Sequence, residues 1–207
     1  PEERQKLAAV CMGSSRVSTW NLPNEYQEMD FYWLKGVVEQ LCMRLNVGDL
    51  RFERAERSSL HPGRSATVIV GGQQIGHLGE ISREVQRAYD LPSPAVVLEL
   101  DLDTLISKAN LLAQYLPQPR FPAVNRDLAL VVDQDEAHSG AHLIEAAERS
   151  GGDLLESVSI FDVYTDPERL GVGRKSVAMR LVFRDPDRTL TDDEVDEAMR
   201  GIIQHME

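Results

Sequence analysis

The sequence predicts an α+β protein of two domains, each with a mostly antiparallel sheet and amphipathic helices. At 207 residues the chain exceeds the usual size of a single domain. Runs with the two-residue period of strands occur beside stripes with helical spacing, both before and after a proline-rich segment. Hydrophobic residues make up 42% of the chain and charged residues 27%, as in ordinary folded proteins.

The first predicted domain, residues 1–114, begins with an amphipathic helix. Asp30 is the expected N-cap and Gly48 lies past the end of the helix. Its apolar stripe consists of Phe31, Leu34, Val38, Leu41 and Leu45.

Four strands are predicted after this helix. They cover residues 51–56, 66–70, 74–81 and 95–102, and a hairpin at Gly71-Gly72 joins the middle pair. The segment from His61 to Arg64 is interpreted as a turn into a strand. Together these strands favour a mostly antiparallel sheet.

The boundary between the domains is predicted at a linker covering residues 115–122. Pro117, Pro119 and Pro122 fall within this segment. Closely spaced prolines prevent a helix and favour an extended connector.

The second predicted domain, residues 123–207, has the order strand, helix, strand, strand, helix. The strands are expected at 128–132, 155–164 and 175–183. The first helix ends at Gly151-Gly152, and Thr191 to Glu194 form a capping box for the second. This is a ferredoxin-like order that lacks one further strand, which we expect to be truncated or disordered. Pro1 in place of Met also indicates a piece of a longer protein, or processing.

The cysteine content, the lack of targeting segments and the net charge limit the compartment and the binding partners that the sequence predicts. Two isolated cysteines, Cys11 and Cys42, and the lack of a signal peptide or a long apolar run favour a cytoplasmic protein without a membrane partner. A net charge of −12 opposes RNA binding, because cationic contacts to phosphate supply most non-specific affinity. Six basic residues nevertheless lie between residues 169 and 188 and predict a local basic patch.

No complete catalytic constellation is found. The glycine-rich segment from Gly171 to Ser176 lacks the glycine that a phosphate loop needs before its lysine, so we interpret it as a hairpin connection. His138 and His142 have helical spacing with Glu145 nearby, but a solvated helix entrance is favoured over a metal site. The alternating acids Glu99, Asp101 and Asp103 are interpreted as solvent-facing.

Two strands of the second domain carry the candidate binding residues. Asp162 and Tyr164 lie two residues apart and so share a face, where a ring can stack on a base and a carboxylate can accept from its edge. In the next strand, Ser176 and Arg180 occupy the face opposite the apolar residues. The pattern fits equally well a tyrosine packed at a sheet edge beside a solvated aspartate, so both interpretations stay open.

Seven motifs together resemble the β subunit of bacterial phenylalanyl-tRNA synthetases over essentially the whole chain. Those resembling its anticodon-binding ferredoxin-like domain are Phe121–Val132, Phe161-Asp-Val-Tyr164, Gly173-Arg-Lys-Ser176 and Arg188–Glu194. Those similar to its catalytic-like module, a class II synthetase relative without active-site residues, are Asp30–Gly36, His61–Ala66 and Ile75–Glu80. The family's N-terminal tRNA-binding and editing portions are not represented.

The resemblance implies a fragment that supports phenylalanine–tRNA ligase and has no catalytic residues of its own. Asp162, Tyr164 and Ser176 match the family's contacts to the first anticodon base. Arg174, Lys175 and Arg180 are predicted phosphate contacts from their charge alone. The implied partners are tRNA(Phe) and a synthetase α subunit in an α2β2 heterotetramer, with no DNA partner. ATP and Mg2+ are implied for the whole enzyme only, and no metal site is expected here.

A small-molecule regulatory module is the alternative interpretation, because ferredoxin-like domains serve many functions. A complete enzyme is disfavoured, because no nucleophile, base or metal set was identified.

Overall fold

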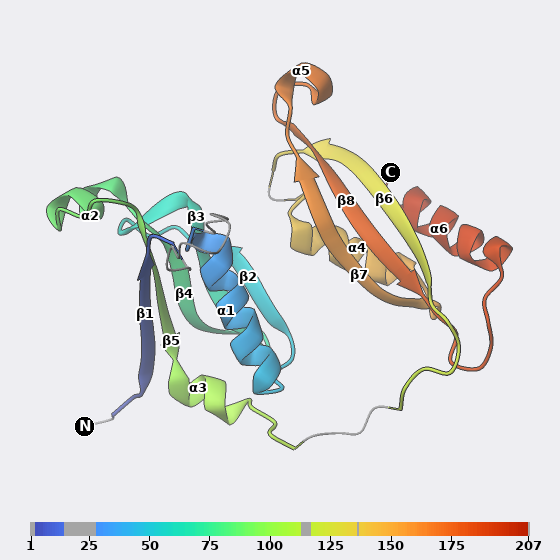
Figure 1. Cartoon of the computed structure of the whole chain (residues 1–207), viewed down its shortest axis with the longest axis horizontal. Helices are drawn as coiled ribbons and strands as arrows, with labels where there is room; N and C mark the ends of the chain where they lie inside the picture. The colour runs from blue at the N-terminus through green and yellow to red at the C-terminus, as the bar shows by residue number, and fades with distance from the viewer. Residues whose placement is uncertain (1–2, 15–27, 113–116, 136, 207) are drawn as a thin grey trace, which may run out of the picture. The chain divides into compact units, whose positions relative to one another are not determined.

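The structure is a computed structural model that describes residues 3–14, 28–112, 117–135 and 137–206. The chain forms two compact units, residues 1–114 and residues 115–207 (Figure 1). Residues 115 and 116 of the predicted linker lie outside the described residues, and the interpretation of 115–122 as a linker stays a prediction.

The first unit contains a five-stranded antiparallel sheet. Its strand order is β1-β5-β4-β3-β2. The strands are β1 (Lys6–Met12), β2 (Leu50–Arg54), β3 (Leu60–Val70), β4 (Gln73–Ile81) and β5 (Ala95–Asp101). The short helices α2 (Arg83–Ala88) and α3 (Leu102–Ser107) flank β5 in the sequence. The antiparallel sheet and the helices of this unit agree with the predicted α+β class.

Helix α1 (Phe31–Arg44) packs on the sheet of the first unit and closes its core (Figure 1). Asp30 is its N-cap, as predicted, and accepts a hydrogen bond from the Trp33 amide at 2.8 Å. Leu34 and Val38 are buried against Leu78 and Leu100 in one apolar cluster. The helix ends with Leu45 as its C-cap, earlier than Gly48, and the Leu45 amide bonds back to the Leu41 carbonyl.

Some predictions for the first unit need correction. Strand β1 was missed, although its residues alternate between exposed and half-buried, and it pairs with β5 at an edge of the sheet. Helices α2 and α3 were also missed. The predicted turn at His61 to Arg64 lies inside β3, where the pairing with β4 is irregular. The hairpin at Gly71 and Gly72 is confirmed, because both residues have positive φ and β3 and β4 pair on either side.

The second unit is a three-stranded antiparallel sheet with order β6-β8-β7. Its elements are β6 (Val124–Asp133), α4 (Gly140–Ser150), β7 (Leu155–Tyr164), α5 (Pro167–Leu170), β8 (Arg174–Phe183) and α6 (Asp192–Met206). The predicted order of strands and long helices is confirmed, while the four-residue helix α5 was missed. Among the described residues of this unit there is no fourth strand.

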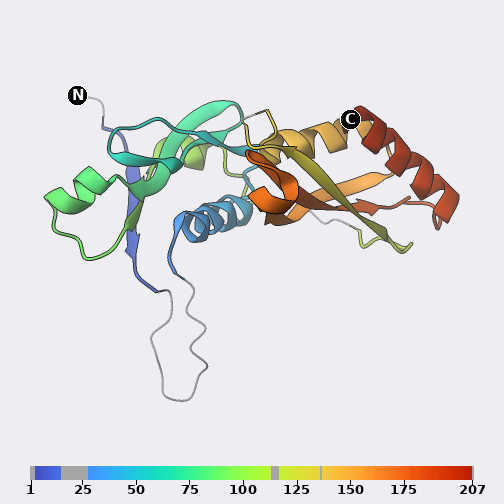
Figure 2. The ribbon, with the colours of Figure 1, turned by 90° about the horizontal axis from the view of Figure 1, so that it is seen from above.

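Both long helices of the second unit cover the same face of its sheet (Figure 2). Leu143 and Ala147 of α4 and Val195 and Ile202 of α6 are buried with the inward side chains of β8. These β8 residues are Val177, Met179, Leu181 and Phe183. The helices therefore leave the opposite face of the sheet uncovered by any described helix of this unit. No helix in the described part of the chain is long and apolar enough to cross a membrane.

Candidate nucleic-acid interface

The uncovered face of the second unit's sheet is built from alternate residues of its three strands. In antiparallel pairs, directly opposed residues point to the same face. Ser176 is opposed by Val131 of β6 and by Tyr164 of β7. Ala178 is likewise opposed by Asp162. The structure thus brings Asp162, Tyr164 and Ser176 to one face, away from α4 and α6.

A β-bulge at Phe161 decides that Asp162 and Tyr164 face outward. Ile160 opposes Met179 and packs into the core, whereas Asp162 opposes the next residue, Ala178. Phe161 is therefore one extra residue in β7. In a strand of strict period two, Asp162 and Tyr164 would follow Ile160 toward the helices. The bulge shifts the alternation by one residue and turns both side chains outward.

Tyr164 is accessible at the end of β7, and its phenol is held by a neighbour. The residue is 42% exposed. Its Oη donates to Oδ2 of Asp166 at 2.6 Å. This hydrogen bond to Asp166 raises the pKa of Tyr164 and lowers the pKa of Asp166. The ring is therefore kept as a neutral phenol with a set orientation.

Asp166 is a site residue that sequence reasoning missed. Its Oδ1 accepts from the backbone amides of Glu168 at 2.9 Å and Arg169 at 3.2 Å, so it also caps α5. An aspartate directly before a proline is a helix-start signal, because proline suits the first position of a helix. That signal was present in the sequence at Asp166-Pro167. Its hydrogen bond with Tyr164, in contrast, could be recognised only in the folded loop.

The three predicted phosphate contacts do not form one basic patch. Arg180 makes two hydrogen bonds to Asp127, Nε to Oδ1 at 2.8 Å and Nη2 to Oδ2 at 2.9 Å. Arg174 lies 3.5 Å from the carboxylate of Asp133. Lys175 opposes Val132, so its position belongs to the helix-covered face. Two of the cations are thus already paired with carboxylates, and the third lies on the other side.

Phe161 was also missed as a site residue. The residue is 54% exposed, and the guanidinium carbon of Arg180 lies 5.1 Å from the centroid of its ring. A bulged residue breaks the alternation on which the interpretation of the strands depended. Arg180 alternates with the buried residues Met179 and Leu181 of β8, so it lies on the outward face with Tyr164, and the Phe161 ring lies beside it.

The remaining sequence candidates show ordinary structural contacts. Ser139 caps α4, and His138 lies before it with Nδ1 2.6 Å from Oδ1 of Asp135. Asp101 caps α3 through the Thr104 amide, which lowers the pKa of its carboxyl. Among the described residues, no group of three or more His, Cys, Asp or Glu side chains is placed to hold a metal ion.

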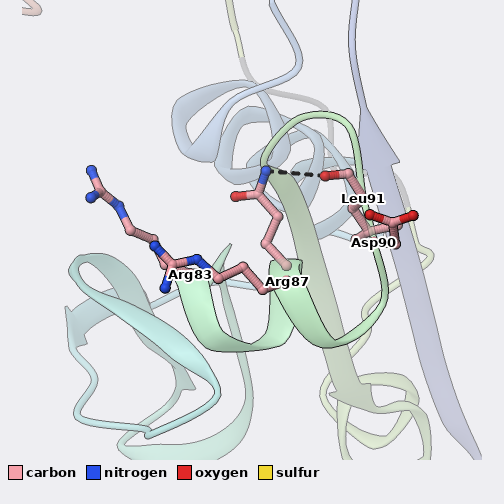
Figure 3. A pocket seen from close by; sticks show the side chains of 5 residues that line it. Arg83, Arg87, Asp90 and Leu91 are labelled. Atoms are coloured by element: carbon pink, nitrogen blue, oxygen red, sulfur yellow. Dashed lines mark hydrogen bonds between the residues drawn. The ribbon is translucent and has the colours of Figure 1, made fainter.

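The first unit has a shallow pocket of its own, which is lined in part by two arginine side chains. Arg83, Gln86 and Arg87 of α2 line it with Asp90 and Leu91, around about 310 Å³ (Figure 3). Gln86 closes the loop by donating to the Leu91 carbonyl at 3.3 Å. Because its two cations extend from one short surface helix, the pocket alone indicates no particular ligand.

Comparisons with known proteins give one family match for each of the two units. Residues 1–102 match the family described as "Phenylalanyl tRNA synthetase beta chain CLM domain". Residues 119–207 match "Ferredoxin-fold anticodon binding domain". The second match supports the ferredoxin-like interpretation, whereas a class II synthetase-like fold for the first unit is not established by either description.

Relatives that align with nearly the whole of this chain are named as phenylalanine–tRNA ligase β subunits. The chain is 47% identical to that of Symbiobacterium thermophilum over 197 residues, 95% of this chain and 21% of the relative. It is 41% identical to that of Moorella thermoacetica and 35% identical to that of Bacillus subtilis, each over 208 aligned residues, all of this chain and 25% of the relative. The chain thus spans between a fifth and a quarter of the length of these relatives. The chain therefore matches, over nearly its whole length, one segment of phenylalanine–tRNA ligase β subunits.

Proposed function

We propose that the second unit of this chain binds the anticodon of tRNA(Phe) as part of phenylalanine–tRNA ligase. The observation that carries the proposal is the common outward face of Asp162, Tyr164 and Ser176. An exposed phenol ring can stack on a base, while the carboxylate and the hydroxyl can hydrogen-bond its edge. This arrangement suits an unstacked base of a single-stranded loop better than a duplex.

The electrostatics support a weak, assisted contact. The chain carries a net charge of −12, and Arg180 and Arg174 on the binding face are paired with Asp127 and Asp133. Stacking and edge contacts must therefore supply most of the affinity, with little counterion release. Such a domain works best when the rest of a larger enzyme holds the same tRNA.

The first unit is proposed to be the class II synthetase-like catalytic-like module, which contacts the α subunit. The family description of residues 1–102 and the five-stranded antiparallel sheet support this role. The whole enzyme is proposed to be a cytoplasmic α2β2 heterotetramer. Its ATP and Mg2+ belong to the α subunit in this proposal. No observation specifically favours a small-molecule regulatory module.

Titration of the chain with a tRNA(Phe) anticodon stem-loop at low salt tests the proposal. Tyr164→Ala should weaken binding roughly tenfold, because stacking on one base is lost. Tyr89→Ala is a matched control, because Tyr89 is also an exposed tyrosine but lies in the first unit. Equal affinities of wild type and Tyr164→Ala would contradict the proposal.

A further inference from the structure

The outward face carries a second planar surface three residues from Tyr164. We name it the Phe161 shelf and define it as Phe161, Arg180 and Asp127. Phe161 comes from the bulge of β7, Arg180 from β8 and Asp127 from β6. All three strands of the sheet therefore contribute to it.

Phe161 contributes nothing to the apolar core of this unit. It is absent from the apolar cluster against which its neighbours Val158 and Ile160 pack, and the residue is more than half exposed. Packing of the apolar core therefore does not explain why a large exposed ring occupies this inserted position of the strand. Bulges commonly re-aim a side chain toward a binding site.

The guanidinium of Arg180 is fixed as a flat surface. Its bidentate pairing with Asp127 sets the orientation of its plane, and the Phe161 ring lies beside it at 5.1 Å. Its side chain remains 48% exposed, so part of it is open to a ligand. The pairing also raises the pKa of Arg180 and lowers that of Asp127, so both stay charged. The charge of Arg180 is balanced, which suits stacking better than phosphate binding.

Aromatic rings and arginine planes are the surfaces on which proteins stack unpaired bases. Phe161 of the shelf and Tyr164 lie on one strand, β7, roughly 10 Å apart at the usual rise per residue. Two neighbouring nucleotides of an open loop can span this distance when their bases are splayed apart. We infer that the Phe161 shelf stacks a second anticodon base, next to the base held by Asp162, Tyr164 and Ser176. This inference rests on the proposed anticodon binding and extends it from one base to two.

Three RNA probes distinguish the two bases. They are an intact tRNA(Phe) anticodon stem-loop and two copies of it, one abasic at the first anticodon position and one abasic at the second. Each is titrated against the full 207-residue chain at low salt. The wild-type chain should bind each abasic probe roughly tenfold more weakly than the intact loop.

The variant Phe161→Leu removes the ring and keeps an apolar side chain. It should bind the intact loop roughly tenfold more weakly and should no longer discriminate against loss of the second base. It should still discriminate against loss of the first base. Arg180→Lys retains the charge without the plane, and it should show the same pattern more weakly. Circular dichroism verifies that both variants are folded, and if one is not, the other decides.

The outcomes separate the inference from the function on which it rests. Wild-type affinity in both folded variants, or undiminished sensitivity to the second base, would overturn the shelf while leaving one-base binding by Tyr164 in place. A shelf variant that loses sensitivity to both bases equally would also overturn it, because a general disturbance of the face would then explain the loss. If the wild-type chain binds none of the probes, the proposed anticodon binding itself fails.

Discussion

Tyr164 can present its ring in one orientation because its phenol donates a hydrogen bond to Asp166, with 2.6 Å between the two oxygens. Asp166 is held in turn by two backbone amides of α5. The short helix thus acts as a brace for the side chain at the end of β7. A side chain that a neighbouring residue holds in place stays ordered before a ligand binds, which favours stacking.

Replacing Asp166 should be visible in the titration of Tyr164. In Asp166→Ala the phenol loses the carboxylate that raises its pKa, so the pKa of Tyr164 should fall toward its ordinary value of 10.0. NMR titration of tyrosine ring carbons measures this, with the Tyr164 signal assigned from Tyr164→Phe. Asp162→Ala is the control, because Asp162 shares the face without contributing to that shift. An unchanged Tyr164 pKa in Asp166→Ala would refute the brace.

At the scale of elements, local signals account for where the long helices begin. Asp30 caps α1, and Ser139 caps α4. At α6, Glu194 reaches back to the Thr191 amide at 2.9 Å and pairs with Arg188 at 2.7 Å. Such contacts satisfy backbone groups that the first turn of a helix leaves without partners. They depend on residues close in sequence, so they were predictable.

The start of α6 should make the second unit sensitive to acid. Hydrogen bonds from Arg188, followed by those from Thr191, lower the pKa of Glu194 from 4.5 to about 2. A carboxyl with a depressed folded-state pKa stabilises the fold above its unfolded pKa and loses that contribution as it is protonated. The urea midpoint should therefore fall between pH 4.5 and pH 2, as followed by methyl NMR signals of residues 124–206.

Glu194→Gln is the matched variant for this acid effect. Its amide oxygen can still accept from Thr191 but does not titrate, so the midpoint should be lower at neutral pH and should fall less in the same window. Other carboxylates, such as Asp127 and Asp166, titrate in both proteins and cancel in the comparison. Parallel pH profiles of the two proteins would argue against the assigned role of Glu194.

Two glycines of the first unit should respond in opposite directions to alanine. A Cβ on Gly76 of β4 would lie 2.0 Å from the Glu99 carbonyl oxygen of β5, so Gly76→Ala must push the two strands apart. A cost of about 1–3 kcal/mol is expected for such overpacking. Gly36 of α1 has open space around its Cβ position, so Gly36→Ala should stabilise by about 0.5–1 kcal/mol. Urea unfolding followed by tryptophan fluorescence measures both, since the two tryptophans of the sequence, Trp20 and Trp33, both fall within residues 1–114. A tolerated Gly76→Ala would contradict the close strand approach.

At the scale of the whole molecule, the chain has two separate cores. Leu34, Val38 and Leu100 belong to one apolar cluster, and Phe183 and Ile202 to another. The division at residues 114 and 115 assigns each cluster to its own compact unit. Each unit should therefore unfold as its own cooperative domain.

Core mutations should destabilise one unit at a time. Phe183 is fully buried, so Phe183→Ala should cost the second unit about 3–5 kcal/mol through lost contacts and a cavity. Hydrogen exchange should then accelerate within residues 124–206 and stay unchanged within residues 28–112. Leu34→Ala is the reciprocal variant and should affect only the first unit. Faster exchange in both units from either mutation would mean that the two cores unfold together.

The sequence alone determined the order of the main elements and the shared face of Asp162 and Tyr164. Hydrophobic periodicity and helix capping depend on residues that are close in the sequence, so both could be recognised there. It also carried the family resemblance that the comparisons bear out. The tertiary structure decided which way that face points, since the inserted Phe161 reverses the alternation established by Ile160. It likewise decided that Arg180 is paired, because its partner Asp127 is 53 residues away. Edge strand β1 became recognisable through its pairing with β5, far along the chain. Such contacts depend on how distant segments meet, and no local period or cap encodes that.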